Sequence, residues 1–345
     1  MQAGAISPAH VVDGDVVVRN VSRSNGVFAL AAGDRDLVVK GPALLDPDAE
    51  ARLACERRFY ALAAGDPDLV RAAPIPALVA EPDDVLVLER VRPGETLEDR
   101  ARERGVLPGD AALLGSALGA WRRVSGRLAA LELAGRLPWV LEALGPAPPD
   151  AVVRSVGAAR LAAVLRREPV LADGLAGLRA GWRRDAIVHG DVRWDNALVD
   201  EDERSGRERV VLVDWEFLGV GDAGWDVAGA LADVIALAAA PEPAAPGPNG
   251  YRPAPAGELV RLSRQVAEPV EAFRSAYRAA APTELAEADL EAGVRLLPAR
   301  VLQIAFLHAA WGLEEGLGSA LQLAGVAGAM LGETGGRAQA GARSA

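Results

Sequence analysis

Two stretches decide the fold, Ile187-Val-His-Gly-Asp-Val-Arg-Trp-Asp-Asn-Ala-Leu-Val-Asp200 and Val210-Val-Leu-Val-Asp-Trp-Glu216. The first opens with an apolar pair that predicts a strand, and the chain leaves this strand at Asp191. The second is a continuous, mostly β-branched run, typical of a buried strand, and it ends in Asp214. The polar, glycine-containing segment 200–209 between them favours a hairpin. The pattern therefore predicts acidic side chains at strand ends that face a cleft.

Asp191, Asn196 and Asp214 match what phosphoryl transfer from a nucleoside triphosphate requires. Such a site needs one carboxylate beside the acceptor hydroxyl, and an amide and a second carboxylate that hold Mg²⁺ on the phosphates. A single aspartate at a strand end is usually a turn former or a helix cap. Three such residues in this order and spacing are much more specific. We therefore interpret this region as a kinase-like site.

The motif resembles the aminoglycoside phosphotransferase and choline kinase family, which shares the protein-kinase-like fold. The resemblance implies that Asp191 is the catalytic base and that Asn196 and Asp214 bind Mg²⁺, with ATP as the phosphoryl donor. For His189 it implies a structural role in shaping the loop, and a role as general acid is the alternative. Arg193 is expected to contact the transferring phosphate or the acceptor, unless it is merely solvated.

The continuation of the motif contains further acids. Asp222 and Asp226 are expected to cap the next helix and to tie down the catalytic loop. The role of Glu216 stays open.

The N-terminal region predicts the nucleotide-binding part. Segments 16–21 and 27–30 have the composition of strands, and the small residues between them would let backbone amides approach the phosphates. This turn lacks the glycine repeat of protein kinases. Its candidate nucleotide-binding residues are Ser22, Ser24, Asn25 and Gly26.

Lys40 is the only lysine in the chain, and it ends an apolar strand over 37–42. We expect its ammonium group to bind the α and β phosphates, whereas a solvated strand-end lysine is the alternative. The helix predicted over 48–62 offers Glu56 as the partner of this lysine, with Glu50 as the competing choice. The resemblance favours Glu56, because it lies beside Phe59 and Tyr60, where the family's glutamate sits.

The apolar run 85–91 predicts a strand. It resembles the edge strand and linker of the family, which implies that the adenine ring meets the backbone around Glu89 to Val91. We expect an α+β fold with two lobes. Residues 1–91 would form a small, β-rich nucleotide-binding lobe, and residues 92–345 a large, mainly helical lobe for catalysis and the acceptor. The tail, about 335–345, is expected to be disordered.

The composition narrows the function classes. The formal net charge of −11 argues against nucleic-acid binding and favours a cationic acceptor. Cys55 is the single cysteine, which excludes an intrachain disulfide and fits a cytoplasmic setting. We expect neither a secretion signal nor membrane insertion, because no apolar run reaches the roughly 20 residues that span a bilayer.

The acceptor is open between two kinds of hydroxyl. Four segments resemble phosphotransferase-like proteins associated with lanthipeptide and thioamitide maturation: 21–25, 38–42, 56–60 and 189–196. This finer resemblance implies phosphorylation of Ser or Thr in a ribosomal precursor peptide, followed by elimination by a partner lyase. The broader family implies a small molecule, such as an aminoglycoside, a sugar or an amino alcohol. We favour the peptide slightly.

A third hypothesis is a kinase-like module without catalysis that binds a peptide or a partner protein. Retention of Lys40, Asp191, Asn196 and Asp214 argues against it, since a module that has lost its activity need not keep all four.

Overall fold

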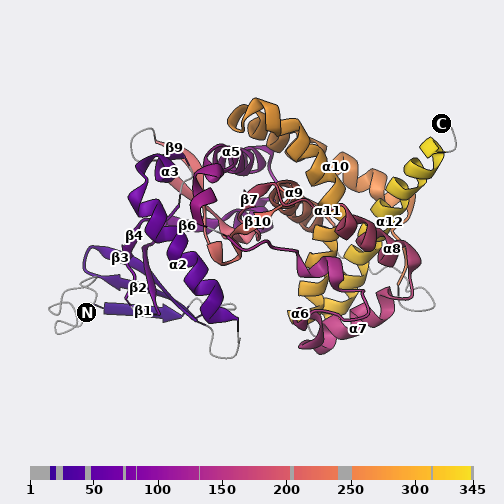
Figure 1. The fold of residues 1–345 in the computed structure, drawn as a ribbon, viewed down its shortest axis with the longest axis horizontal. Helices are drawn as coiled ribbons and strands as arrows, with labels where there is room; N and C mark the ends of the chain where they lie inside the picture. Colours follow the sequence, from indigo (N-terminus) through magenta and orange to yellow (C-terminus); the bar gives the residue numbers. More distant parts are fainter. Residues whose placement is uncertain are drawn as a thin grey trace.

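The computed structural model describes residues 16–20, 26–42, 48–72, 75–82, 84–131, 133–202, 206–239, 251–311 and 314–342. An N-terminal antiparallel sheet with one long helix stands beside a mostly helical C-terminal part (Figure 1). This arrangement confirms the predicted α+β fold. The small sheet that carries the hairpin between Asn196 and Asp214 lies between the N-terminal sheet and the helices (Figure 1).

The N-terminal sheet has the strand order β1-β2-β3-β5-β4. Its strands are β1 (Val16–Asn20), β2 (Gly26–Ala32), β3 (Arg35–Gly41), β4 (Leu78–Ala80) and β5 (Leu86–Glu89). The register places Lys40 opposite Val27 on one side and Leu86 on the other. The prediction of 85–91 as an edge strand is wrong, because β4 pairs with its outer side. A strand of three half-buried residues is too short to show a clear periodicity.

One face of helix α2 (Ala49–Gly65) is buried, and the helix contacts β4 of the N-terminal sheet. Leu53, Tyr60 and Ala63 are among its buried residues, and their spacing is helical. Glu56 lies on the same buried face. A buried carboxylate requires a partner, so its position among apolar residues already points to the charge cluster described below.

Two smaller sheets carry the segments that contain Asp191, Asn196 and Asp214. One has the order β6-β8-β9 and the other pairs β10 with β7. Their strands are β6 (Pro93–Thr96), β7 (Ala186–Val188), β8 (Ala197–Asp202), β9 (Arg207–Leu212) and β10 (Gly219–Gly221). The expected hairpin is the β8–β9 pair. Strand β6 pairs with β8 and begins at Pro93, which is compatible with the first position of an edge strand.

Helices form most of the remainder. They are α3 (Pro67–Ala72), α4 (Leu97–Arg104), α5 (Pro108–Val124), α6 (Asp150–Val153), α7 (Val156–Leu165), α8 (Pro169–Ala180), α9 (Gly224–Ala238), α10 (Ala256–Ala280), α11 (Thr283–Trp311) and α12 (Glu314–Ala342), with 3₁₀ turns η1 (Ser125–Leu131), η2 (Trp139–Glu142), η3 (Trp194–Asn196) and η4 (Trp215–Phe217). Helix α9 is central: it packs against α11, while α5 packs against α10 and α11 against α12 (Figure 1).

The C-terminal end differs from expectation. Helix α12 continues to Ala342, whereas the sequence leads us to expect a disordered tail from about residue 335. Residues 337–340 are arginine, alanine and glutamine, which are good helix formers and favour continuation of the helix. Within the described residues, no helix combines the length and the apolar character that a membrane span requires.

Helices α5 and α10 approach each other closely at two glycines. A Cβ atom on Gly115 would lie 2.4 Å from the carbonyl oxygen of Phe273, and one on Gly119 would lie 2.8 Å from that of Tyr277. Both contacts are to backbone, which cannot move away without shifting a helix.

We expect Gly115→Ala to destabilise the fold by about 1–3 kcal/mol, because the added methyl group overpacks this contact. The matched control is Gly177→Ala in α8, where a Cβ would meet no atom within 4 Å. That control should gain about 0.5–1 kcal/mol from helix propensity. Urea denaturation of both variants measures the difference, and equal effects would contradict the close approach of α5 and α10.

Candidate active site

The first half of the loop that carries Asp191 is held by α9. The Asp226 carboxylate, in the first turn of this helix, accepts hydrogen bonds from the backbone N–H groups of His189 at 2.8 Å and Gly190 at 3.0 Å. The indole of Trp225 donates to the Gly190 carbonyl at 3.0 Å. Burial raises the pKa of Asp226, although His189 and these N–H groups favour its charged form. Asp226 therefore ties down the loop, as the sequence predicts.

The second half of the loop is held further along the same helix. The Asp233 carboxylate accepts from the Trp194 backbone N–H at 2.6 Å, and the Trp194 indole donates to the Ala230 carbonyl at 2.9 Å. Asp226, Ala230 and Asp233 are four and three residues apart, so they share one helix face. Burial raises the pKa of Asp233 to about 7, although Arg193 and the Trp194 N–H favour ionisation. Helix α9 thus places three hydrogen-bond acceptors along the loop, from Asp226, Ala230 and Asp233.

Asp222 fixes the start of α9. It accepts a hydrogen bond from the Gly224 N–H at 3.0 Å, which satisfies a backbone donor at the helix start as predicted. Its buried carboxylate also lies 2.6 Å from Arg295 of α11 and 3.3 Å from Arg183. The helix that supports the loop is therefore itself anchored by charge.

Asp191 presents a partly exposed carboxylate on this loop. The Asn196 amide donates to the Asp191 carbonyl oxygen at 3.0 Å and lies 3.4 Å from its carboxylate Oδ2. Arg193 turns toward Asp195, with 2.6 Å between Nη2 and Oδ2. Burial opposes the charge on Arg193, but carboxylates, Asp191 first among them, raise its pKa. Arg193 is thus held among acids beside Asp191 rather than simply solvated.

His189 is fully buried beneath the loop. Its Nδ1 accepts from the Asp191 backbone N–H at 3.3 Å, and its Nε2 lies 3.0 Å from the carbonyl oxygen of Val213, to which it donates. Both ring nitrogens are therefore engaged by backbone. This geometry favours the structural role over the general-acid alternative.

Lys40 lies at the centre of a buried charge cluster. Its Nζ is 2.5 Å from Glu56 Oε2 and contacts Asp214 Oδ1 directly. Glu56 also accepts from the Trp215 backbone N–H at 3.1 Å. Burial opposes the charge on Lys40, but Glu56, Asp214 and Glu216 raise its pKa above the ordinary value. The structure therefore brings together residues from β3, α2 and the end of β9.

Two more residues define this cluster. Glu50, the competing partner for the lysine, is exposed in the first turn of α2 and so is not the residue that Lys40 contacts. Glu216 is buried, 3.5 Å from Arg52 Nε and 4.0 Å from Lys40 Nζ. The sequence leaves the role of Glu216 open. In the structure its carboxylate balances the positive charges of Arg52 in α2 and Lys40 in β3.

Asp214 and Asn196 stand at adjoining ends of β9 and β8. The Val213 N–H donates to the Asn196 carbonyl at 3.0 Å. Asp214 has a left-handed φ of 69°, uncommon for a residue other than glycine. Mg²⁺ prefers oxygen ligands and commonly takes only one or two from the protein, the rest coming from phosphates and water. A carboxylate and an amide oxygen fit such an ion, and the described residues contain no group of three or more His, Cys, Asp or Glu placed to hold a metal alone.

The family profile described as the phosphotransferase enzyme family matches residues 16–261, which include Lys40 and the whole catalytic hairpin. The chain belongs to this family. The prediction of a phosphotransferase enzyme is thereby confirmed. A search of curated proteins finds no match.

Solved structures share the fold at low identity. A microcompartment-associated aminopropanol kinase is 17% identical, with 94% of this chain and 93% of that chain covered and a TM-score of 0.55. Choline kinase from Cryptosporidium parvum is 11% identical, with 98% and 94% covered and a TM-score of 0.56. Ethanolamine kinase from Plasmodium vivax is 11% identical, with 92% and 82% covered and a TM-score of 0.54. These likenesses confirm the kinase-like fold; the finer resemblance to peptide-maturation proteins stays a prediction.

The expected nucleotide contacts of this phosphotransferase are only partly within the structure. Gly26 is the first residue of β2, at the edge of the turn expected to cover the phosphates. The Glu89 N–H donates to the Ala77 carbonyl at 2.9 Å, so an adenine contact at Glu89 would have to use its carbonyl oxygen. Val91 follows just after β5. The residues that lie outside the described part are Ser22, Ser24 and Asn25.

An aromatic cluster connects the charge cluster to the catalytic loop. Trp215 is fully buried, stacked on Phe59 of α2 with 4.4 Å between ring centroids and packed edge-on to Trp121 of α5 at 4.6 Å. The His189 ring lies 4.4 Å from it on another side. Helix α2 is thus joined to the catalytic loop by packing as well as by charge.

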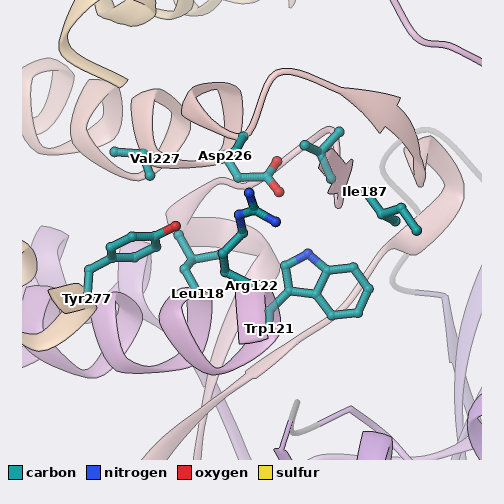
Figure 2. Close-up of a pocket in the computed structure, with 9 residues that line it drawn as sticks. Leu118, Trp121, Arg122, Ile187, Asp226, Val227 and Tyr277 are labelled. Atoms are coloured by element: carbon teal, nitrogen blue, oxygen red, sulfur yellow. The ribbon is translucent and has the colours of Figure 1, made fainter. Parts of the chain in front are cut away.

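A small cavity lies on the inner side of the catalytic loop. Figure 2 shows Arg122 extending from α5 toward Asp226, with Tyr277 and Trp121 on either side. Arg122 Nε is 2.8 Å from Asp289 Oδ2, which also accepts from the Tyr277 hydroxyl at 3.0 Å. Since the cavity faces Asp226 rather than the Asp191 carboxylate, it belongs to the support of the loop.

Sequence reasoning missed Arg300 and the loop contact of Asp233. Arg300 of α11 lies 3.6 Å from Asp191 Oδ1, although 109 positions separate them. The available signal for both is the same: a charged residue within an apolar stretch of a helix needs a buried partner. The partner's identity comes only from the fold.

Glu56 should make stability depend on pH. Burial raises its pKa to about 7, despite the opposing charge of Lys40, whereas a glutamate in the unfolded chain titrates near 4.5. Only between these two pH values does the folded state therefore keep more of this proton than the unfolded chain does. The stabilisation by the bound proton is complete below the pKa of the unfolded chain. Between the two pKa values the free energy of unfolding falls by roughly 1.4 kcal/mol per pH unit, and the stabilisation is lost once the pH exceeds the folded-state pKa.

We expect the free energy of unfolding of the unchanged protein to fall more steeply between about pH 5 and 7 than that of Glu56→Gln. Urea denaturation across this range measures both slopes. Glu50→Gln, at the exposed glutamate of the same helix, is the control and should keep the slope. A Glu56→Gln slope equal to that of the control would mean that Glu56 is ionised throughout.

Proposed function

We propose that this phosphotransferase transfers the γ-phosphoryl group of ATP, bound with Mg²⁺, to a hydroxyl group of a small, positively charged acceptor. The observation that carries the proposal is the placement of Asp191 beside Asn196, with Asp214 at the adjoining strand end and Lys40 against it. A hydroxyl-activating carboxylate and a phosphate-binding set thus share one region.

The nucleotide side is the charge cluster. Asn196 and Asp214 would hold Mg²⁺, which neutralises charge on the phosphates when it is bound. Lys40 would direct its ammonium group to the phosphates, while Glu56 keeps it in place. The polar contacts of Glu56 to Lys40 and to the Trp215 N–H make it a positioning residue.

The acceptor side is the Asp191 carboxylate. It orients the acceptor hydroxyl in line with the γ-phosphorus and takes the hydroxyl proton. The new bond joins the acceptor oxygen to the γ-phosphorus, the bond to the β–γ bridging oxygen breaks, and ADP leaves with that electron pair. Holding the loop by its backbone keeps the carboxylate in this orientation.

The charge around the loop favours a cationic acceptor. Arg193 lies among four carboxylates, Asp191, Asp195, Asp233 and Glu98, which all raise its pKa. The formal net charge of −11 extends this negative potential over the molecule. Three proteins of the same fold are named for amino alcohols: aminopropanol, ethanolamine and choline. The peptide acceptor and its partner lyase rest on the motif resemblance alone, so the small cationic acceptor is preferred.

The proposal also covers the division of the chain into two lobes and its location in the cell. Strand β5 ends at Glu89, and β6 already pairs with the catalytic hairpin, which supports a lobe division near Val91. The nucleotide-binding lobe would then be 1–91 and the acceptor lobe 92–345. A cytoplasmic enzyme has ATP available and keeps Cys55 reduced.

The test is phosphoryl transfer from labelled ATP to a panel of acceptors. We expect product with ethanolamine, choline, 1-amino-2-propanol or an aminoglycoside, and none with a neutral sugar. Asp191→Asn should lower turnover by about 100- to 10,000-fold, because the proton acceptor is lost, while Mg²⁺–ADP affinity by calorimetry stays unchanged. Product only with neutral sugars or with a Ser/Thr peptide would overturn the cationic small-molecule proposal.

For the metal, we expect Asp214→Asn to remove most of the Mg²⁺ dependence of ADP binding, because one of two protein ligands is weakened. Calorimetry with and without Mg²⁺ measures this effect. Asp200→Asn is the control, since that acid lies on the same hairpin and pairs with Arg209 at 2.8 Å. Identical metal dependence in the two variants would contradict the assignment of Asp214.

A further inference from the structure

Arg300 of α11 lies directly beneath the catalytic loop and is only 2% exposed. Its Nη2 donates to the carbonyl oxygen of Val192 at 2.5 Å, and its Nη1 is 3.6 Å from Asp191 Oδ1. Nη1 also donates to Gln303 on the same helix at 3.2 Å. One guanidinium therefore contacts both the catalytic carboxylate and the peptide group that follows it.

The surroundings are arranged for this guanidinium. It lies over the Trp225 ring at 4.8 Å, and its charge also favours the ionised forms of Asp226 and Asp233. A Cβ at Gly229 of α9 would come within 2.8 Å of Nη2 and 2.3 Å of the Val192 carbonyl oxygen. A glycine at this place leaves room for the contact between Arg300 and the loop.

Burial of an arginine is costly unless its charge is paired and its donors are bonded, and an apolar residue at this position of a buried helix would be cheaper. Simple packing therefore does not explain the residue. The Asp191 carboxylate has Arg300 at Oδ1 and the Asn196 amide at Oδ2. Two groups on opposite oxygens restrict the rotation of the carboxylate.

We propose that Arg300 is a positioning residue for phosphoryl transfer, acting through Asp191 and the Val192 carbonyl. It holds the loop backbone at the residue after Asp191 and sets the plane of the carboxylate toward the acceptor hydroxyl. The inference rests on the proposed function, because it needs Asp191 as the group that activates the acceptor. It assigns a role in the reaction to α11, which contributes none of the motif residues.

The test compares Arg300→Gln and Arg300→Lys by their kcat and KM, with ethanolamine as acceptor, or with water as acceptor in Mg²⁺-dependent ATP hydrolysis. We expect kcat of Arg300→Gln to fall on the order of 100-fold, as for a misplaced catalytic group, with KM for ATP unchanged. Lysine keeps the charge but not the forked geometry, so Arg300→Lys should recover part of the loss.

Arg295→Gln is the matched control. Arg295 is on the same helix and also pairs with an aspartate, Asp222, at 2.6 Å, but that aspartate supports the start of α9 rather than the acceptor. Loss of the Arg295 side chain should lower the melting temperature without lowering kcat. An equal fall in kcat in both variants, or unchanged kcat in Arg300→Gln, would overturn the inference. If Arg300→Gln does not fold, Arg300→Lys against Arg295→Lys is judged by the same criteria.

A thermal-unfolding cycle adds a measurement that does not depend on turnover. We expect the double variant Asp191→Asn with Arg300→Gln to lose less in melting temperature than the two single changes together, because each single change already removes the same charge interaction. Additive shifts would show that the two side chains are independent, against the inference. Full turnover in Asp191→Asn would refute the proposed function itself, whereas lost turnover there with normal kcat in Arg300→Gln would refute only the role of Arg300.

Discussion

The active region depends on one buried ammonium group. Lys40 contacts carboxylates from two other segments, Glu56 of α2 and Asp214 after β9, and Glu216 lies 4.0 Å away. Because an unpaired charge in a protein interior is costly, the sheet, the helix and the hairpin cannot separate without a large penalty. The stacking of Trp215 on Phe59 adds an apolar contact to the same junction. Charge and packing thus fix the same three elements.

The catalytic loop is built on a different principle. Its hydrogen bonds to α9 and α11 use backbone N–H and C=O groups, held by Asp226, Asp233 and Arg300. These side chains come from helices that follow the hairpin in the sequence, so the loop takes its shape only when the helices are packed. The active region therefore combines a charge cluster between the two parts of the chain with a loop supported by the helices of one part.

Several residues of the candidate site could be predicted from sequence, because the pattern that marks them is local. Asp191, Asn196 and Asp214 are close in sequence and stand at the ends of apolar runs, so their proximity follows from a hairpin. Lys40 and Glu56 could be paired because a lone lysine after an apolar run is conspicuous, and because Glu56 lies beside Phe59 and Tyr60, where the family that the motif resembles has its glutamate.

Other features lacked a local signal. Strand β4 has three residues, and β6 contains Pro93, so neither shows the alternation that marks a strand. The contact of Arg300 with Asp191 joins residues far apart in the chain, and periodicity says nothing about which helix reaches which loop. The turn expected to cover the phosphates and the segment 240–250 lie outside the described residues.

The way the loop is held has an evolutionary consequence. Since α9 and α11 hold main-chain atoms of the loop, these hydrogen bonds do not dictate the identity of the partly exposed Arg193. Exchanging this side chain would change the polar group beside Asp191 without reshaping the scaffold. Proteins with this architecture can therefore acquire new acceptors by point mutation, while the residues proposed to bind the phosphates stay unchanged.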